Sequence, residues 1–114
     1  MILTELVDRM GLTPLTESIG SVPEIEAGYV GDLLSHVLAS ATPNCLWITI
    51  QRHENVVAVA QVAGLTGVVF AEGVRPEAKV VERAQNAGIA LFSSPDSSFE
   101  LAGRLHRLLH PERS

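Results

Sequence analysis

The chain has 114 residues, of which 46% are hydrophobic and 18% charged, and it carries a formal net charge of -5. This length and composition predict a single domain over residues 1–114 and exclude a disordered or collagen-like chain. The eight basic residues are scattered among 13 acidic ones, so we expect no binding to a nucleic acid backbone. No apolar run is long enough to span a membrane, and charged residues interrupt residues 1–10, so we expect a cytoplasmic protein without a signal peptide.

The first quarter of the chain predicts a helix and a weak strand. Apolar residues at helical spacing favour an amphipathic helix over residues 2–10, which ends at Gly11. Residues 12–16 are a strand candidate that suits the edge of a sheet, because Pro14 cannot donate to a neighbouring strand. Residues 17–24 have the composition of a loop.

The next segment predicts two strands around a short helix. Residues 25–30 favour a strand, and residues 32–39 favour a helix for which Asp32 is the expected N-cap. The expected apolar face of that helix consists of Leu33, Leu34, Val37 and Leu38. A turn at residues 42–44 leads into residues 45–50, an apolar strand that we expect at the centre of the sheet.

The second half of the chain alternates between helices and strands. The β-branched residues of 56–63 would also allow a strand, but Asn55 as a cap, the alanines and the following Gly64 favour a buried helix. Strands are expected at residues 67–71 and 89–93. Two further helices are expected, at residues 76–87 with Gly88 as the stop, and after Ser97, which with Glu100 has the spacing of a capping box.

Strands and helices that alternate with short connections call for right-handed crossovers and a largely parallel sheet between helical layers. Ligands bind such sheets at the carboxyl ends of the strands, where loops and helix N-termini meet. This rule selects three segments as a candidate ligand-binding rim: residues 49–55, 72–73 and 93–97.

Each candidate residue has a structural and a functional interpretation. His53 could act as a general base or a ligand contact, or its ring could bond to backbone. Gln51 and Thr49 offer uncharged donors and acceptors that suit a base edge or an amide, or they could satisfy the end of a strand. The lone Cys45 is interpreted as a small buried residue, since it has no partner for a disulfide or a thiolate-rich zinc site.

Motifs of the common enzyme classes are missing from the sequence. It has no GxxxxGK[ST] phosphate loop, no GxSxG elbow, no GxGxxG after a strand and no paired carboxylates at a common strand exit. His36, His106 and His110 have no arranged carboxylate or thiol partner, so we predict no metal site and no cofactor. We therefore predict no catalytic residues; a small enzyme that uses His53 is the minor alternative.

The runs GYVGDLLSHVLASA, LWITIQRHENVVAVAQVAGLTGVVFAEG and SFELAGRLHRLL together resemble the stand-alone DRTGG-domain proteins of bacteria. These proteins are similar to the N-terminal domain of HPr kinase/phosphorylase and to regulatory modules of phosphotransacetylases and CBS-containing pyrophosphatases. The resemblance implies an α/β fold: a single-domain α/β/α sandwich with a mixed, largely parallel sheet of about five strands. It also implies a non-catalytic, regulatory role, because the kinase loop belongs to a different domain.

The naming motif is degraded in this chain. At the positions where the family has Asp, Arg, Thr, Gly and Gly, the alignment places Val22, Pro23, Glu26, Ala27 and Gly28, so only the last glycine is retained. Residues further along fit the stand-alone pattern, and those that the resemblance places in a ligand-binding pocket are Tyr29, Asp32, Ser35, Thr49, Gln51, His53 and Asn55.

Two hypotheses of function follow. The first is a regulatory module that binds a small nucleotide-like or anionic ligand at these residues. The alternative is a protein–protein interaction subunit that docks on a larger metabolic enzyme, with the polar residues serving only as caps. In either case we expect a homodimer, because of the Pro-containing edge strand and by analogy with the related modules.

Overall fold

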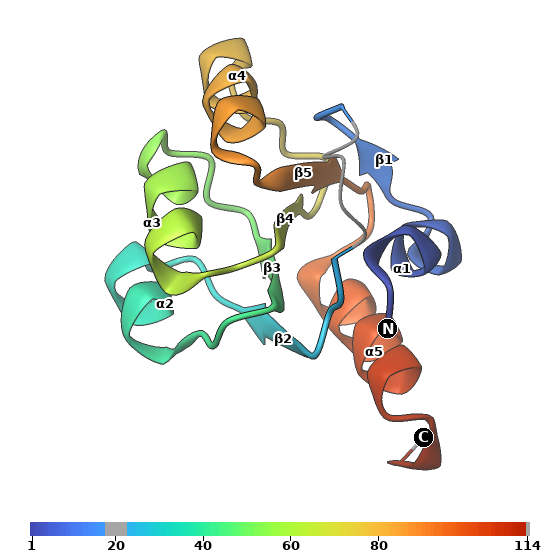
Figure 1. Ribbon diagram of the computed structural model, residues 1–114. Coiled ribbons are helices and arrows are strands. Elements are labelled where there is room, and N and C mark those ends of the chain that lie inside the picture. The colour runs from blue at the N-terminus through green and yellow to red at the C-terminus, as the bar shows by residue number, and fades with distance from the viewer. Residues whose placement is uncertain (18–22, 114) are drawn as a thin grey trace.

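In the computed structural model, which describes residues 1–17 and 23–113, one sheet lies between two layers of helices (Figure 1). The strands are β1 (Thr13–Pro14), β2 (Ala27–Val30), β3 (Cys45–Thr49), β4 (Gly67–Phe70) and β5 (Ala90–Ser93). The helices are α1 (Leu3–Met10), α2 (Leu34–Ser40), α3 (Asn55–Ala63), α4 (Ala78–Ala87) and α5 (Ser98–Leu109), followed by the 3-10 turn η1 (Pro111–Arg113). The predicted α/β/α sandwich with a five-stranded sheet is confirmed.

The strand order is β1-β5-β4-β3-β2. Strands β2 to β5 are parallel neighbours, whereas β1 pairs antiparallel with β5, so the sheet is mixed as expected. Pro14 lies in the edge strand β1, where its missing donor costs no ladder hydrogen bond. The expectation that residues 45–50 form the centre of the sheet is wrong by one position: β3 is flanked on both sides, but β4 is the middle strand.

Alternation along the strands divides the interior into two cores. Leu46 and Ile48 of β3 face the layer of α1 and α5, whereas Cys45 and Trp47 of the same strand face α2, α3 and α4. Because both faces are covered, all five residues of β3 are buried. The apolar, non-alternating composition of this strand is the direct consequence.

Helix ends follow the predicted glycines. Gly11, Gly64 and Gly88 are the C-caps of α1, α3 and α4, each in the left-handed conformation that glycine adopts without strain. At the start of α5, the Ser97 hydroxyl accepts from the backbone N–H of Glu100 at 3.1 Å. Residues 56–63 lie within α3, so the predicted helix is confirmed there and the alternative of a strand is not.

Helix α2 differs from its prediction. It begins at Leu34, and Leu33 before it is extended and 68% exposed. Leu38 is 46% exposed, so only Val37 of the predicted apolar face is buried. The reason is that this two-turn helix lies at the end of the sheet, where only the side chain of Val37 is fully covered.

The predicted loop at residues 17–24 is described only in part, since residues 18–22, and with them Val22 of the degraded motif, lie outside the described residues. Beyond that gap, Glu24 forms an isolated antiparallel bridge with Ile2. The N-terminal amine of Met1 also donates to the Glu24 carboxylate at 3.0 Å. The chain just before β2 is therefore anchored to the start of α1.

The retained motif glycine has a packing role. A Cβ added to Gly28 would lie 2.5 Å from Leu105 Cδ2, because α5 lies directly on β2 at this point. We expect Gly28→Ala to lower the free energy of unfolding by about 1–2 kcal/mol through overpacking. Gly103→Ala is the matched control: it lies within α5, where the added Cβ meets only Arg107 Nη1 at 3.6 Å.

The control should raise the free energy of unfolding by about 0.5–1 kcal/mol, since alanine favours the helix over glycine. Urea denaturation followed by circular dichroism measures both variants. Equal effects of the two substitutions would contradict the packing role of Gly28.

Candidate functional site

The carboxyl ends of β2 and β3 are joined by the side chain of Asp32. Its Oδ1 atom accepts from the Thr49 hydroxyl at 2.8 Å and from the backbone N–H of Ile50 at 2.9 Å. The prediction that Asp32 caps the following helix is wrong, because Leu33 occupies the N-cap position and makes no side-chain cap bond. Asp32 instead bonds across to the neighbouring strand.

A chain of hydrogen bonds continues from Thr49 through the β3–α3 loop. Gln51 donates its backbone N–H to the Thr49 hydroxyl at 3.0 Å and its side-chain amide to the Asp32 carbonyl at 3.3 Å. The Gln51 side-chain oxygen accepts from the backbone N–H of His53 at 3.1 Å. Each of these polar groups thus helps to hold the loop in its shape.

His53 covers the N-terminus of α3. Its Nδ1 atom accepts from the backbone N–H of Asn55 at 3.1 Å, and its carbonyl accepts from that of Val56 at 3.0 Å. An Nδ1 acceptor carries no proton, so the ring here has its proton on Nε2, which points away from these bonds as a donor. Asn55, predicted as the cap, is instead the first residue of α3, and Glu54 precedes it.

A polar cavity of about 470 Å³ opens beside this loop. Its lining joins the β3–α3 loop to the start of α4 and consists of Gln51, Arg52, His53, Glu54, Glu77, Lys79 and Val80. Two cationic and two carboxylate side chains face the same space, together with an amide and an imidazole. Such a set offers donors for anionic oxygens and acceptors for hydroxyl groups.

Lys79 forms ion pairs with both carboxylates of the cavity. Lys79 Nζ lies 3.3 Å from Glu54 Oε2 and 3.6 Å from Glu77 Oε2. The hydrogen bond and charge of Lys79 lower the pKa of Glu54, and the same contact raises the pKa of Lys79. Both groups therefore remain charged over the neutral pH range, and the cavity holds balanced charge.

The remaining candidate residues lie apart from this cavity. Ser35 and Asn55 line a separate hollow between α2 and α3. Tyr29 points to the same side of the sheet, with its ring centroid 6.2 Å from that of His36. Thr49 is fully buried, and its hydroxyl accepts from the backbone N–H of Gln51 in the loop. Of the seven predicted residues, the structure brings only Gln51 and His53 into the polar cavity.

Sequence reasoning missed the contribution of α4 to the cavity. Glu77 and Lys79 lie more than twenty residues beyond the β3–α3 loop, and nothing in local spacing connects them to it. The available signal is the parallel sheet itself, since the loops that follow neighbouring strands β3 and β4 meet at one edge.

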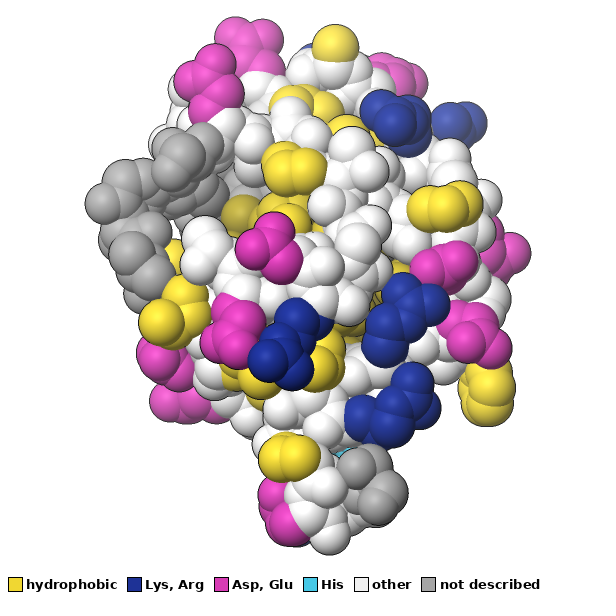
Figure 2. Space-filling view, turned by 90° about the vertical axis from the view of Figure 1, so that its right-hand side faces the viewer, with side chains coloured by type: hydrophobic (Ala, Val, Ile, Leu, Met, Phe, Trp, Pro, Cys, Tyr) yellow, Lys and Arg dark blue, Asp and Glu magenta, His cyan; other side chains and the backbone are white. Residues whose placement is uncertain are grey.

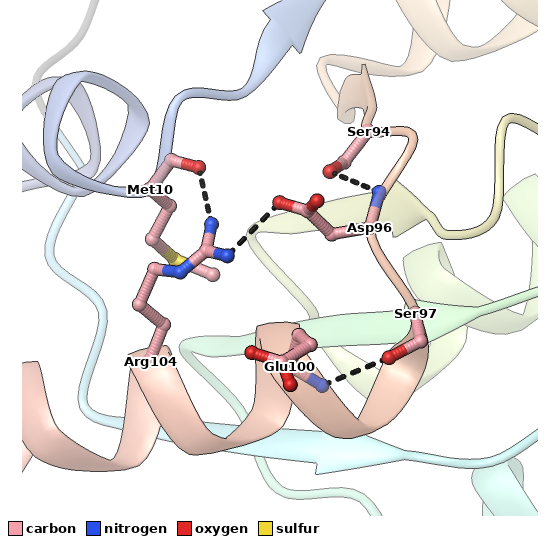
Figure 3. A network of polar contacts seen from close by, with 6 residues as sticks. All are labelled: Met10, Ser94, Asp96, Ser97, Glu100 and Arg104. Atoms are coloured by element: carbon pink, nitrogen blue, oxygen red, sulfur yellow. Dashed lines mark hydrogen bonds and ion pairs between the residues drawn. The ribbon is translucent and has the colours of Figure 1, made fainter.

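The exits of β4 and β5 form a closed network rather than an open site. Arg104 of α5 donates to the Met10 carbonyl at 3.0 Å and to Asp96 Oδ2 at 2.9 Å, which ties the β5–α5 loop to the end of α1 (Figure 3). The Ser94 hydroxyl accepts from the backbone N–H of Asp96 at 3.1 Å. The backbone N–H groups of Glu72 and Gly73 donate to the carbonyls of Asp96 and Ser94 at 2.8 and 2.9 Å, so the candidate segments 72–73 and 93–97 bond to each other and stabilise the fold.

Cys45 is buried in the core that faces α2, α3 and α4. Desolvation raises the pKa of its thiol from 9.0 to about 11, with a smaller opposing effect of a backbone hydrogen bond from Thr42. The folded state therefore favours the neutral thiol. Its contribution to the free energy of unfolding is complete below pH 9.0 and is lost as the pH rises through about 11, because the exposed thiol of the unfolded chain ionises first.

A test of Cys45 follows from its buried thiol. At pH 8 we expect Ellman's reagent to label the folded chain at least about 100-fold more slowly than the chain in guanidinium, because burial suppresses the reactive thiolate. Comparable labelling rates in the two states would contradict the buried position.

Among the described residues, no group of three or more His, Cys, Asp or Glu side chains is placed to hold a metal ion. The rings of His106 on α5 and of His110, the residue that ends this helix, have centroids 5.0 Å apart, but no further side chain of this kind joins them in the described part of the chain. A search of residues 1–17 and 23–113 for a helix long and apolar enough to cross a membrane finds none.

The fold and the sequence agree on the family. A profile described as the DRTGG domain matches residues 26–108, which covers β2 to α5. The chain belongs to the DRTGG domain family. No significantly similar protein was found among curated proteins.

The DRTGG fold also appears in a similar solved structure, the regulatory region of Clostridium perfringens pyrophosphatase, which holds CBS and DRTGG domains. That structure is a complex with the activator diadenosine tetraphosphate. The similarity has a TM-score of 0.68 at 12% sequence identity, and it covers 90% of this chain but only 45% of the other. At this identity the likeness establishes a common fold, and this DRTGG chain spans less than half of the solved chain.

Proposed function

We propose that this DRTGG chain is a non-catalytic regulatory module that binds a small nucleotide-like ligand in the cavity beside the β3–α3 loop. The observation that carries the proposal is the placement of Arg52, His53 and Lys79 around one open space at the carboxyl edge of the sheet. Ligands of parallel α/β sheets bind at this edge. The complex of the pyrophosphatase regulatory region with a dinucleotide activator supports the same ligand class.

The chemistry of the cavity suits a nucleotide in two respects. Arg52, Lys79 and the Nε2–H of His53 are donors for phosphate oxygens. Glu54 and Glu77 are acceptors for ribose hydroxyls, a use of carboxylates that is common in nucleotide sites. Lys79 now forms ion pairs with these two carboxylates. Binding would break these pairs and replace them with contacts to the ligand.

The test is isothermal titration of the full chain with AMP, ATP and diadenosine tetraphosphate. We expect at least one of them to bind, and Arg52→Ala and Lys79→Met each to weaken it by about tenfold or more, as loss of a charged hydrogen bond does. Arg9→Ala on α1 is the control with an unchanged affinity. No binding would contradict the ligand class, whereas binding that survives both cavity variants would place the site elsewhere.

The second candidate function is docking on a larger metabolic enzyme. It is favoured by the solved regulatory region of a pyrophosphatase, in which a DRTGG domain accompanies CBS domains. A pull-down in which the same partner enzyme is retained by Arg52→Ala and Lys79→Met would support docking that is independent of the cavity. Failure to retain any partner enzyme would count against it.

A further inference from the structure

A hollow opens beside the contact between α5 and the edge strand β2. Its volume is about 280 Å³, and its walls come from α5, β2 and one residue of β3. The lining consists of Ala27, Gly28, Val30, Ile48, Ala102, Leu105, His106, Leu109 and His110. The two histidines are therefore the polar side chains of an otherwise apolar lining.

His106 and His110 converge on this hollow from the end of α5. His106 lies in the last turn of the helix, and His110 is its C-cap, four residues further on. A spacing of four brings two side chains to one side of a helix, as in the HExxH pair that binds zinc. His106 is exposed and His110 is half-buried, so an ion from solvent can reach both rings.

The separation of the two rings suits chelation of one metal ion. An imidazole nitrogen bonds such an ion at about 2.0–2.1 Å, which puts each ring centre roughly 3.2 Å from the metal. Two rings at adjacent positions, with a bond angle of about 90–109°, then have centres roughly 4.5–5.2 Å apart. The centroids of His106 and His110 are 5.0 Å apart, so the backbone already holds the rings at this separation.

We propose that His106 and His110 together bind a divalent ion of the late first-row metals, such as Cu²⁺, at the mouth of this hollow. Imidazole is a preferred ligand of these metals, and the affinity of a given site is highest for Cu²⁺. The sequence predicts no metal site because these histidines have no carboxylate or thiol partner. Two imidazoles form a chelate without such a partner, and water or a small ligand in the hollow fills the remaining positions.

The surroundings of the pair accept a cation. The chain has a net charge of -5, and the side of the molecule with α1 and α5 shows acidic and basic side chains spread over its surface (Figure 2). Arg104 is already paired with Asp96. The other charged residues close to the pair in sequence are exposed, so water and salt screen them: Arg107, Glu112 and Arg113.

This inference goes beyond the proposed ligand site and does not depend on it. The polar cavity lies between the β3–α3 loop and α4, on the side of the sheet that α2, α3 and α4 cover. Helix α5 covers the opposite side together with α1. The two sites are therefore separated by the sheet and can be tested one at a time.

Isothermal titration of the full chain with Cu²⁺ in a non-coordinating buffer tests the proposal. We expect one ion per chain, and a dissociation constant that rises by about tenfold or more in His106→Gln and in His110→Gln, because each variant loses the chelate. His36→Gln is the matched control, since it removes an exposed imidazole from α2 instead. Electron paramagnetic resonance of the Cu²⁺ complex should show two imidazole nitrogens in the natural chain and one in each of the first two variants.

Circular dichroism first confirms that all three variants are folded. Binding that is weakened by His106→Gln and by His110→Gln and unchanged in His36→Gln, together with the two-nitrogen spectrum, supports the proposal. The proposal is overturned if the natural chain binds no Cu²⁺, or if His36→Gln weakens binding equally. Binding that survives both α5 substitutions also overturns it, since the metal would then be an adventitious ion only.

Discussion

Replacing Trp47 with alanine is expected to lower the free energy of unfolding by about 3–5 kcal/mol, the usual cost of removing a buried aromatic side chain. Trp47 has no exposed surface, and it lies in the core between the sheet and α2, α3 and α4. Its indole Nε1 donates to the Gly31 carbonyl at 2.8 Å, just beyond the end of β2. The substitution therefore removes both a large part of the core and a tether of the edge strand.

Trp47→Phe separates these two contributions. Phenylalanine retains most of the apolar volume but leaves the Gly31 carbonyl without its indole donor, so we expect a smaller loss of about 1–3 kcal/mol. Guanidinium denaturation followed by far-ultraviolet circular dichroism measures both variants, since Trp47 is the only tryptophan and cannot serve as the probe. A loss in Trp47→Phe equal to that in Trp47→Ala would show that the hydrogen bond, not the core volume, dominates.

The architecture was largely predictable because its signals are local. Gly64 and Gly88 each end a helix in the left-handed conformation, and this backbone requirement is visible in the sequence without knowledge of the rest of the chain. The same holds for Ser97, whose hydroxyl meets an amide three residues away. Even the valines of α3, which alone would also allow a strand, predict a helix once Gly64 is included as its stop.

The misassigned caps show where local reasoning ends. Asp32 lies just before α2 and Asn55 is the first residue of α3, and short polar side chains near such positions usually bond to the helix that follows. Here the Asp32 carboxylate bonds to Thr49 at the end of the neighbouring strand and to Ile50 just beyond it, and His53 rather than Asn55 satisfies the first amides of α3. Which partner prevails depends on the register between β2 and β3, which a single sequence does not contain.

The candidate site was predictable at the level of the sheet edge but not of the individual residues. The rule for parallel sheets selected the β3–α3 loop, where the polar cavity lies. Ser35 belongs to α2 and lines the hollow between α2 and α3, whereas the polar cavity lies between the β3–α3 loop and the start of α4. The contribution of Lys79 depends on a contact between two successive crossover connections, which only the fold reveals.

Replacing Asp32 with alanine is expected to lower the free energy of unfolding by about 1.5–3 kcal/mol, the range for hydrogen bonds to a charged group. The reason is that the Thr49 hydroxyl and the Ile50 N–H lose their shared acceptor, and Thr49 is fully buried. Asp32→Asn retains an oxygen acceptor of nearly the same shape, so its loss should be clearly smaller. Asp8→Ala, at an exposed position on α1, controls for the loss of one negative charge.

A double-mutant cycle with Thr49→Val isolates the contact between the two side chains. Thr49 Oγ1 donates to Asp32 and also accepts from the backbone N–H of Gln51, so the carboxylate stabilises the loop that borders the cavity through this hydroxyl. Chemical denaturation of the four proteins should give a coupling free energy of about 0.5–3 kcal/mol. Additive losses would mean that Asp32 acts through Ile50 alone and that the carboxylate does not stabilise the loop through the Thr49 hydroxyl.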